Sequence, residues 1–304
     1  MSGLVGFKNI IGHSKVKERL QRVLQKPGHS YVIVGEAGLG KLALAKAFAK
    51  ALQCEANSGD ADVAIDSCNA CLSCRVFDSG NHPDVLYVNA TKTKSIGVED
   101  IRNQLVLPMS EKPFRYPYKI FIVNQPLTPQ AQNALLKTIE EPAPFGVFLF
   151  LTESASLYLS TVLSRSITIK LGPLTDEEVA QTVGTSPENL AVKFAQGNPG
   201  RAKDLMESED FAAMQTLAKT VSTEIRRLDI VGVFALFPKF EKWKESIQNL
   251  LDILYMQYFN EFNENGMPGL SAISDAKKAL KQNGNFQMTI EIMLLKLNEG
   301  VQSF

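Results

Sequence analysis

The fold of this chain is decided by the stretch Gly35-Glu36-Ala37-Gly38-Leu39-Gly40-Lys41-Leu42, which reads G-x-x-x-x-G-K followed by leucine. The apolar run 31–34 before it predicts a buried strand, and the helix formers at 42–49 predict a helix. Strand, glycine loop and helix form the context in which this motif binds phosphate. The glycines let backbone N–H groups turn inward, and the helix N-terminus adds partial positive charge. The candidate contacts are therefore Gly35, Gly38, Gly40 and Lys41.

The residue after Lys41 departs from this motif. A serine or threonine hydroxyl at that position normally holds the magnesium ion, and Leu42 has no oxygen to offer. The loop is therefore predicted to keep its shape, and the sequence leaves open whether it still binds ATP or ADP.

Bulk composition narrows the class of protein. The chain has 304 residues, 45% hydrophobic and 21% charged, which is typical of a globular protein of about two domains. Lys+Arg and Asp+Glu both number 32, so strong nucleic-acid binding by this chain alone is not expected. We find neither a signal-peptide pattern at the N-terminus nor an apolar run near the roughly 20 residues that span a bilayer. The expectation is a cytoplasmic protein without membrane association.

Apolar segments alternate with helical patterns over the first half of the chain. A helix is predicted over 98–106, ending near Pro108, and Thr128-Pro129 is a helix-start signal for a helix that runs to Glu140. Such alternation predicts a parallel sheet covered on both faces. The expected strands cover residues 31–34, 84–88, 119–123, 147–151 and 167–169.

After Gly172-Pro173 the sequence predicts helices only. Thr175-Asp176-Glu177-Glu178 is a helix start, and Gly197-Asn198-Pro199-Gly200 interrupts a short helical region. Further on, large apolar residues repeat at helical spacing. They form either a core face or a surface for a partner, and they are Trp243, Ile247, Leu250, Leu251, Leu254, Tyr255, Tyr258 and Phe259.

The four cysteines lie close together in the sequence. Cys54, Cys68, Cys71 and Cys74 follow the spacing C-x13-C-x2-C-x2-C. In a cytosolic protein, clustered cysteines favour a metal over disulfides. Four thiolates suit a closed tetrahedral zinc site, which is structural because it has no open position. The alternative is four reduced, unpaired cysteines in a loop.

The most specific motif follows the third predicted strand, and several shorter motifs accompany it. Thr128–Pro142 resembles the bacterial clamp-loader AAA+ family, in which a run ending N-A-L-L-K-x-x-E-E-P follows the Walker B strand. The cysteine spacing is also similar to the zinc module of that family. The shorter motifs are His29-Ser30-Tyr31 for its H-A-Y, His82-Pro83-Asp84 for its H-P-D, Leu163-Ser164-Arg165-Ser166 for its S-R-C, and Gly197–Ala202 for its lid sensor segment.

The resemblance implies an architecture and an assembly. It implies an AAA+ P-loop αβα domain over 1–172 with the zinc module at about 54–74, a helical lid over 173–208 and a helical collar over 209–304. Gamma/tau and delta subunits, the sliding clamp and, within the complex, primed DNA would be the partners. The chain would then be a subunit of an assembly with DNA polymerase activity.

The departures from the family concern the magnesium site. A working Walker B strand ends in acidic residues, whereas Asn124 and Gln125 are neutral, and a neutral amide brings no charge to a dication. Together with Leu42 they predict a non-hydrolysing stator subunit that holds no magnesium. The alternatives are an ATP-hydrolysing gamma/tau-like motor and a zinc-dependent scaffold unconnected with replication.

The resemblance assigns roles to two arginines. Arg165 would be an arginine finger that reaches a neighbour's nucleotide, since such an arginine stabilises developing phosphate charge. A plain surface arginine is the alternative. Arg201 falls in the sensor segment of the lid and would belong to the degenerate nucleotide site.

Overall fold

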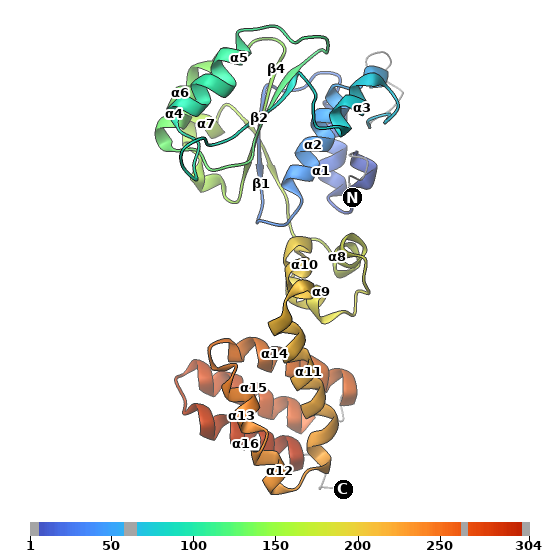
Figure 1. Cartoon of the computed structure of the whole chain (residues 1–304), viewed down its shortest axis with the longest axis vertical. Helices are drawn as coiled ribbons and strands as arrows, with labels where there is room; N and C mark the ends of the chain where they lie inside the picture. The colour runs from blue at the N-terminus through green and yellow to red at the C-terminus, as the bar shows by residue number, and fades with distance from the viewer. Residues whose placement is uncertain (1–5, 58–65, 263–266, 300–304) are drawn as a thin grey trace. The chain divides into compact units, whose positions relative to one another are not determined.

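The computed structural model describes residues 6–57, 66–262 and 267–299. The chain divides into two compact units, residues 1–203 and residues 204–304 (Figure 1). Most of the predicted lid falls in the first unit. The finer division at residue 172 remains a prediction.

The first unit is built on a five-stranded sheet in which all four neighbouring pairs are parallel. The spatial order is β2-β3-β4-β1-β5. The expected strands are confirmed, with ends that move by one residue. Their bounds are β1 Ser30–Val34, β2 Val85–Val88, β3 Lys119–Val123, β4 Gly146–Thr152 and β5 Ile167–Lys170.

Helices cover both faces of this sheet (Figure 1). Alternate strand residues point to opposite faces, so Tyr31 and Ile33 join one core while Val32 joins the other. On the first face lie α1 Ser14–Arg22, α2 Lys41–Leu52 and α3 Leu72–Asp78. On the second lie α4 Val98–Ile101, α5 Leu107–Met109, α6 Pro129–Glu140 and α7 Ser160–Leu163.

The predicted helix starts are confirmed by their caps. The Thr128 hydroxyl accepts a hydrogen bond from the Ala131 amide at 3.2 Å, and α6 ends at Glu140 as expected. Thr175 and Glu178 form a reciprocal capping box at the start of α8, which spans Asp176–Val183. These local signals therefore determine the helix ends without help from tertiary contacts.

The helix predicted over 98–106 with a stop near Pro108 is confirmed, but it ends three residues later, at Met109. The chain stays helical from Val98 to Met109, with a wider π-helical stretch at Arg102–Val106. The Leu107 amide accordingly bonds to the Arg102 carbonyl, five residues back. Proline lacks an N–H and clashes with the preceding turn, and the wider turn accommodates it.

Three short helices follow the sheet within the first unit and the start of the second. They are α8 Asp176–Val183, α9 Leu190–Ala195 and α10 Pro199–Glu207. A small core joins them, made of Leu174, Val179, Ala180, Val192, Ala195 and Ala202. Gln196 and Gly197 both have positive φ, so the expected break between helices falls there.

The second unit is helical throughout its described residues. Of the predicted apolar stripe, six residues are buried core, whereas Tyr255 and Phe259 are 37% and 47% exposed. The stripe is thus mainly core, and Trp243 precedes the helix that carries the rest. The helices are α11 Glu209–Glu224, α12 Ile230–Phe234, α13 Phe237–Glu241, α14 Ile247–Phe262, α15 Met267–Lys281 and α16 Phe286–Glu299.

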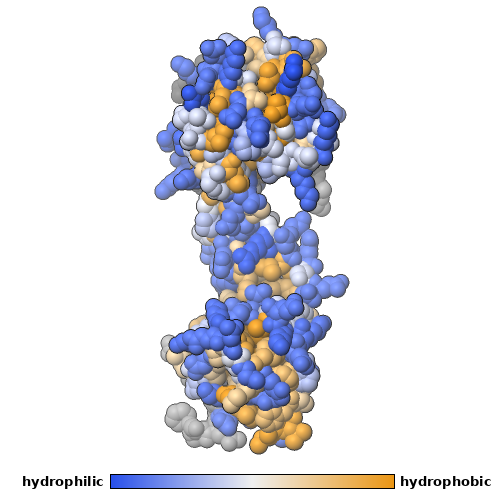
Figure 2. Space-filling view, turned by 90° about the vertical axis from the view of Figure 1, so that its left-hand side faces the viewer, coloured by the Kyte–Doolittle hydropathy of each residue, from blue (hydrophilic) through white to orange (hydrophobic). Residues whose placement is uncertain are grey.

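Apolar surface is exposed at the lower end of this unit in Figure 2, where Figure 1 places α12. Ile230, Val231 and Phe234 of α12 are exposed, Val231 by 76%. Among the described residues, no helix is long and apolar enough to cross a bilayer.

Candidate functional site

The glycine loop lies between β1 and α2 and keeps a phosphate-loop backbone. Gly38 and Gly40 have φ of +89° and +86°, values that side chains strongly disfavour. Gly40 is the N-cap of α2, so the helix N-terminus opens onto the loop. The sequence pattern alone predicted this geometry.

Lys41 is folded back onto the loop. Its Nζ donates to the carbonyls of Gly35 at 2.6 Å and Glu36 at 2.8 Å. Partial burial lowers the pKa of Lys41, and the negative charges of Glu153 and Glu36 oppose that shift. The lysine therefore stabilises the loop itself here, and a phosphate would have to compete with those two carbonyls.

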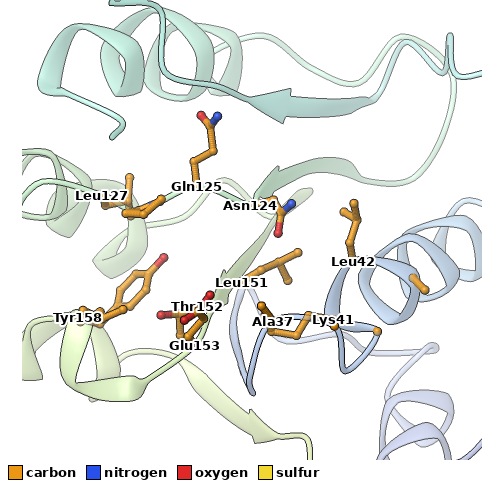
Figure 3. Close-up of a pocket in the computed structure, with 15 residues that line it drawn as sticks. Ala37, Lys41, Leu42, Asn124, Gln125, Leu127, Leu151, Thr152, Glu153 and Tyr158 are labelled. Carbon is orange, nitrogen blue, oxygen red and sulfur yellow. The ribbon is translucent and has the colours of Figure 1, made fainter. Parts of the chain in front are cut away.

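A cavity of about 660 Å³ opens beside this loop (Figure 3). Leu42 and Asn124 both line it, and neither side chain carries a hydroxyl or a carboxylate. Gln125 lines it too, but its Oε1 accepts from the Ala90 amide at 2.7 Å and so holds the chain after β2. Within the described part of the chain, Glu153 at the end of β4 contributes the one carboxylate of the lining.

Sequence reasoning missed Tyr158, which lines the far end of the cavity (Figure 3). Its hydroxyl is buried and has no hydrogen-bond partner among the described residues. Burial raises the pKa of Tyr158. No local sequence signal marks this residue, because its burial depends on packing against Phe150 and the rest of that core.

The lid region contacts the glycine loop directly. Asn198 Nδ2 donates to the Ala37 carbonyl at 2.7 Å, and the Gly200 amide donates to the Gly38 carbonyl at 3.2 Å. A Cβ on Gly38 would lie 2.4 Å from Asn198 Oδ1 and 2.9 Å from Gly200 Cα. Gly38 is thus required twice, by its φ and by this close approach.

Arg201 does not line the larger cavity beside the glycine loop, but it lines a second cavity to which Gly35 and Leu39 of the same loop also contribute. This second cavity has a volume of about 330 Å³ and is also lined by Glu36, Glu153 and Lys170. Glu153 lines both cavities. A role for Arg201 at a nucleotide remains a prediction.

Arg165 lies after α7 and is tied to α6. Its Nε is 2.9 Å from Oε1 of Glu140, and its Nη1 donates to the Thr161 carbonyl at 3.0 Å and to Ser164 Oγ at 3.2 Å. Its side chain is 39% exposed. The arginine is therefore accessible yet held, and the sequence did not indicate Glu140 as its partner.

Two departures from the family motifs meet in space beside Arg165. Ser30 stands where H-A-Y has alanine, and Ser166 stands where S-R-C has cysteine; their Oγ atoms are 2.7 Å apart. Ser166 donates to the Val162 carbonyl at 2.8 Å. Since a hydroxyl has one proton, Ser30 is the donor to Ser166. The two serines therefore form a hydrogen-bonded pair.

The four cysteines converge as expected. Their sulfur atoms all lie within 4.8 Å of one another, close to the ~3.8 Å that a tetrahedron with Zn–S of about 2.3 Å requires. Backbone amides of residues 68, 71 and 74 donate to the sulfurs of Cys54, Cys68 and Cys71 at 3.3, 3.3 and 3.4 Å. A hydrogen bond with Cys74 lowers the pKa of Cys54 to about 4. The donor set fits zinc. Residues 58–65, inside the predicted module, lie outside the described residues.

A buried lysine connects α2 with the cysteine region. Lys50 Nζ donates to Asp78 Oδ1 at 2.7 Å and to Asn69 Oδ1 at 2.6 Å, and its side chain is fully buried. Asn69 lies between two of the cysteines and has a φ of +58°. This ion pair escaped sequence reasoning because a lysine in a helix is usually exposed.

Comparison with known proteins adds named relatives. "DNA polymerase III subunit gamma/tau" of Mycoplasma pneumoniae is 29% identical over 206 residues, which cover 66% of this chain and 29% of that protein. "DNA polymerase III subunit tau" of Bacillus subtilis is 32% identical over 164 residues, which cover 52% and 28%. The chain thus spans under a third of the length of these relatives.

Solved structures show a weaker likeness. A gamma subunit-related protein of Thermotoga maritima has a TM-score of 0.41 at 17% identity and covers 93% of this chain and 98% of its own. The RuvB Holliday junction branch migration motor of the same organism has a TM-score of 0.45 at 16% identity, with 77% and 84% covered.

A protein-family model covers the whole region from the N-terminal helix to the start of the lid. It is described as "DNA polymerase III, delta subunit" and matches residues 12–175, more than half of the chain. Those residues contain the glycine loop, the cysteine cluster and Arg165. The chain therefore belongs to the DNA polymerase III delta subunit family.

Proposed function

We propose that this chain is a non-hydrolysing clamp-loader subunit of DNA polymerase III, of the delta-prime type. It would assemble with gamma/tau and delta subunits in the cytoplasm and help to load the sliding clamp onto primed DNA. Contact with DNA would arise only within the complex, because the chain carries no net charge.

One observation carries this proposal: the loop keeps its backbone while the magnesium ligands are missing. Gly38 and Gly40 retain positive φ, but Leu42 and Asn124 supply neither a hydroxyl nor a carboxylate to the cavity. Phosphoryl transfer depends on the metal to neutralise developing charge. The chain would therefore act through its shape and through Arg165, supplied to the ATP of a neighbouring subunit.

The cysteine cluster would hold one structural zinc ion. Cys54, Cys68, Cys71 and Cys74 would complete its coordination, so the ion would bind no substrate. It would stabilise the segment between α2 and α3.

ATPase measurements on the isolated full-length chain test the proposal. We expect no turnover above background, and none after Leu42→Thr alone, because the acidic pair is still missing. In the reconstituted complex, Arg165→Ala should lower the clamp- and DNA-stimulated ATPase. An arginine finger contributes roughly a thousand-fold or more at one site, although other sites that fire independently would reduce the observed loss.

The names of the relatives favour a second candidate, an ATP-hydrolysing gamma/tau-like motor. Turnover by the isolated chain that disappears in Lys41→Ala would support the motor and contradict the stator. Failure to co-purify with gamma/tau and delta subunits would contradict both.

A further inference from the structure

Residues from two helical segments hold the Arg165 guanidinium in one orientation. Glu140 Oε1 lies 2.9 Å from Nε. The Thr161 carbonyl and Ser164 Oγ both accept from Nη1. Two of the three nitrogens are thus engaged, and Nη2 has no hydrogen-bond partner within the described residues.

Both partners of this ion pair stand on well-supported backbone. Glu140 is the last residue of α6, which is capped by Thr128 at its other end. Arg165 directly follows the α7 region, and the next residue, Ser166, is bonded to Ser30 at the start of β1. The backbone of Arg165 is therefore fixed through the sheet, while Glu140 fixes its side chain.

We infer that Glu140 is a positioning residue that presents Arg165 to the nucleotide of a neighbouring subunit. A free arginine side chain loses many rotamers when it reaches a phosphate, and a pre-oriented one loses fewer. The engaged Nε and Nη1 leave Nη2 for a phosphate oxygen, and both side chains remain partly exposed, 39% for Arg165 and 46% for Glu140. This inference rests on the proposed function.

The test uses the reconstituted complex, with steady-state ATPase measured against ATP concentration in the presence of clamp and primed DNA. Glu140→Ala should lower kcat about two- to fivefold, the range expected for an exposed ion pair. KM should not change, because the finger acts in the transition state. Glu140→Gln should lower kcat about as much as Glu140→Ala, because the contact with Nε is an ion pair and a neutral amide carries no charge.

Two controls separate positioning from mere stabilisation. Glu141→Ala removes the adjacent glutamate, which makes no ion pair among the described residues, and should leave kcat unchanged. Glu140→Ala should have no further effect once Arg165→Ala is present, because the two residues act through one contact. Gel filtration and thermal melting confirm that each variant assembles.

The possible failures are distinguishable. If Arg165→Ala leaves turnover unchanged, the proposed finger is wrong and the inference about Glu140 falls with it. If Arg165→Ala lowers turnover while Glu140→Ala leaves it unchanged or raises it, only the inference is wrong. An equal loss from Glu140→Ala with and without Arg165 would also overturn it, since Glu140 would then act elsewhere.

Discussion

Helix α2 has one motif at each end, and the two motifs differ in how many of their functional residues they retain. At its N-terminus the glycine loop keeps Gly38, Gly40 and Lys41 but has Leu42 in place of the metal-binding hydroxyl. Just past its C-terminus, Cys54 joins three other cysteines whose sulfur atoms all lie within 4.8 Å of one another, a spacing compatible with a zinc site. One helix therefore connects a glycine loop that lacks the metal-binding hydroxyl with a cluster in which four thiol groups converge.

The difference shows that shape and chemistry depend on different residues. The loop needs glycines for its backbone conformation, and hydrolysis needs a hydroxyl and carboxylates for magnesium. The second set can be lost without the first. In the cysteine cluster the same four side chains would bind the metal and hold the segment in its fold. Replacing one cysteine would therefore weaken metal binding and local structure together.

The largest expected effect is at the cysteine end. We predict one zinc per chain after purification without added zinc, and its loss in Cys74→Ser with local unfolding of the module. Structural zinc contributes about 10–16 kcal/mol in small peptides, so the effect should be clear, while the glycine-loop domain should stay largely folded. Metal analysis and thermal unfolding measure both.

The alternative of four reduced cysteines predicts the opposite result. Zinc below about half an equivalent in fresh, reduced protein would count against a structural site, because such sites retain their metal. A chelator should destabilise the natural chain and leave Cys74→Ser unaffected.

The next effect concerns the link between the cysteine region and α2. Lys50→Met should lower the free energy of unfolding by about 3 kcal/mol, the lower end for breaking a buried ion pair, because Asp78 is 25% exposed. Chemical denaturation measures the loss. Lys46→Met, on the same helix, is the matched control; it removes only the contact of Nζ with the Tyr87 ring and should change stability by less than about 1 kcal/mol.

A loss below about 1 kcal/mol for Lys50→Met would mean that the pair behaves like a surface salt bridge. The cysteine region would then be attached to α2 by its apolar contacts.

At the glycine end, two glycines separate backbone strain from contact with the lid. Gly40→Ala should cost about 1–2 kcal/mol through positive φ alone, because nothing lies within 4 Å of its added Cβ. Gly38→Ala should cost about 1 kcal/mol more, because its Cβ would also meet Asn198 and Gly200. If thermal unfolding showed the same loss of stability for both variants, Asn198 and Gly200 would be able to move away from the added Cβ at little cost.

The smallest effect concerns the serine pair beside Arg165. Ser30→Ala should cost about 1 kcal/mol, the net value of one hydrogen bond, and Ser166→Ala should cost more, because it also removes the bond to the Val162 carbonyl. The double variant should cost less than the sum, because both changes remove the same bond. Fully additive losses in denaturation would show that Ser30 and Ser166 do not depend on each other.

Much of the fold could be predicted because its signals are local. Apolar runs located all five strands, and Thr128 and Thr175 located helix starts through their own hydroxyls. The helix that was expected to end near Pro108 ends one residue past it, because a wider helical turn accommodates the proline. That turn is supported by Leu105 and Met109 in the core, which no local pattern reveals.

The candidate site was only partly predictable. Its glycines, Leu42 and the four cysteines could be identified from motif spacing. Glu140 and Asn198 lie in motifs that the sequence marked, but their partners Arg165 and Ala37 could not be predicted, because they are distant in sequence. Tyr158 carried no signal, because it matters through the cavity that it lines.

The sequence by itself determined the pattern of strands and helices and the conformations of the glycines. It also determined the residues of the phosphate loop and the four cysteines, because all of these depend on residue type and short-range spacing. Only the tertiary structure decided that Ser30 faces Ser166, that Glu140 holds Arg165 and that Lys50 is buried against Asp78. Those pairs form when parallel strands and packed helices bring separate segments together, and hydrogen bonds and ion pairs require atoms within about 3 Å. Such distances are set by packing, which no single stretch of sequence encodes.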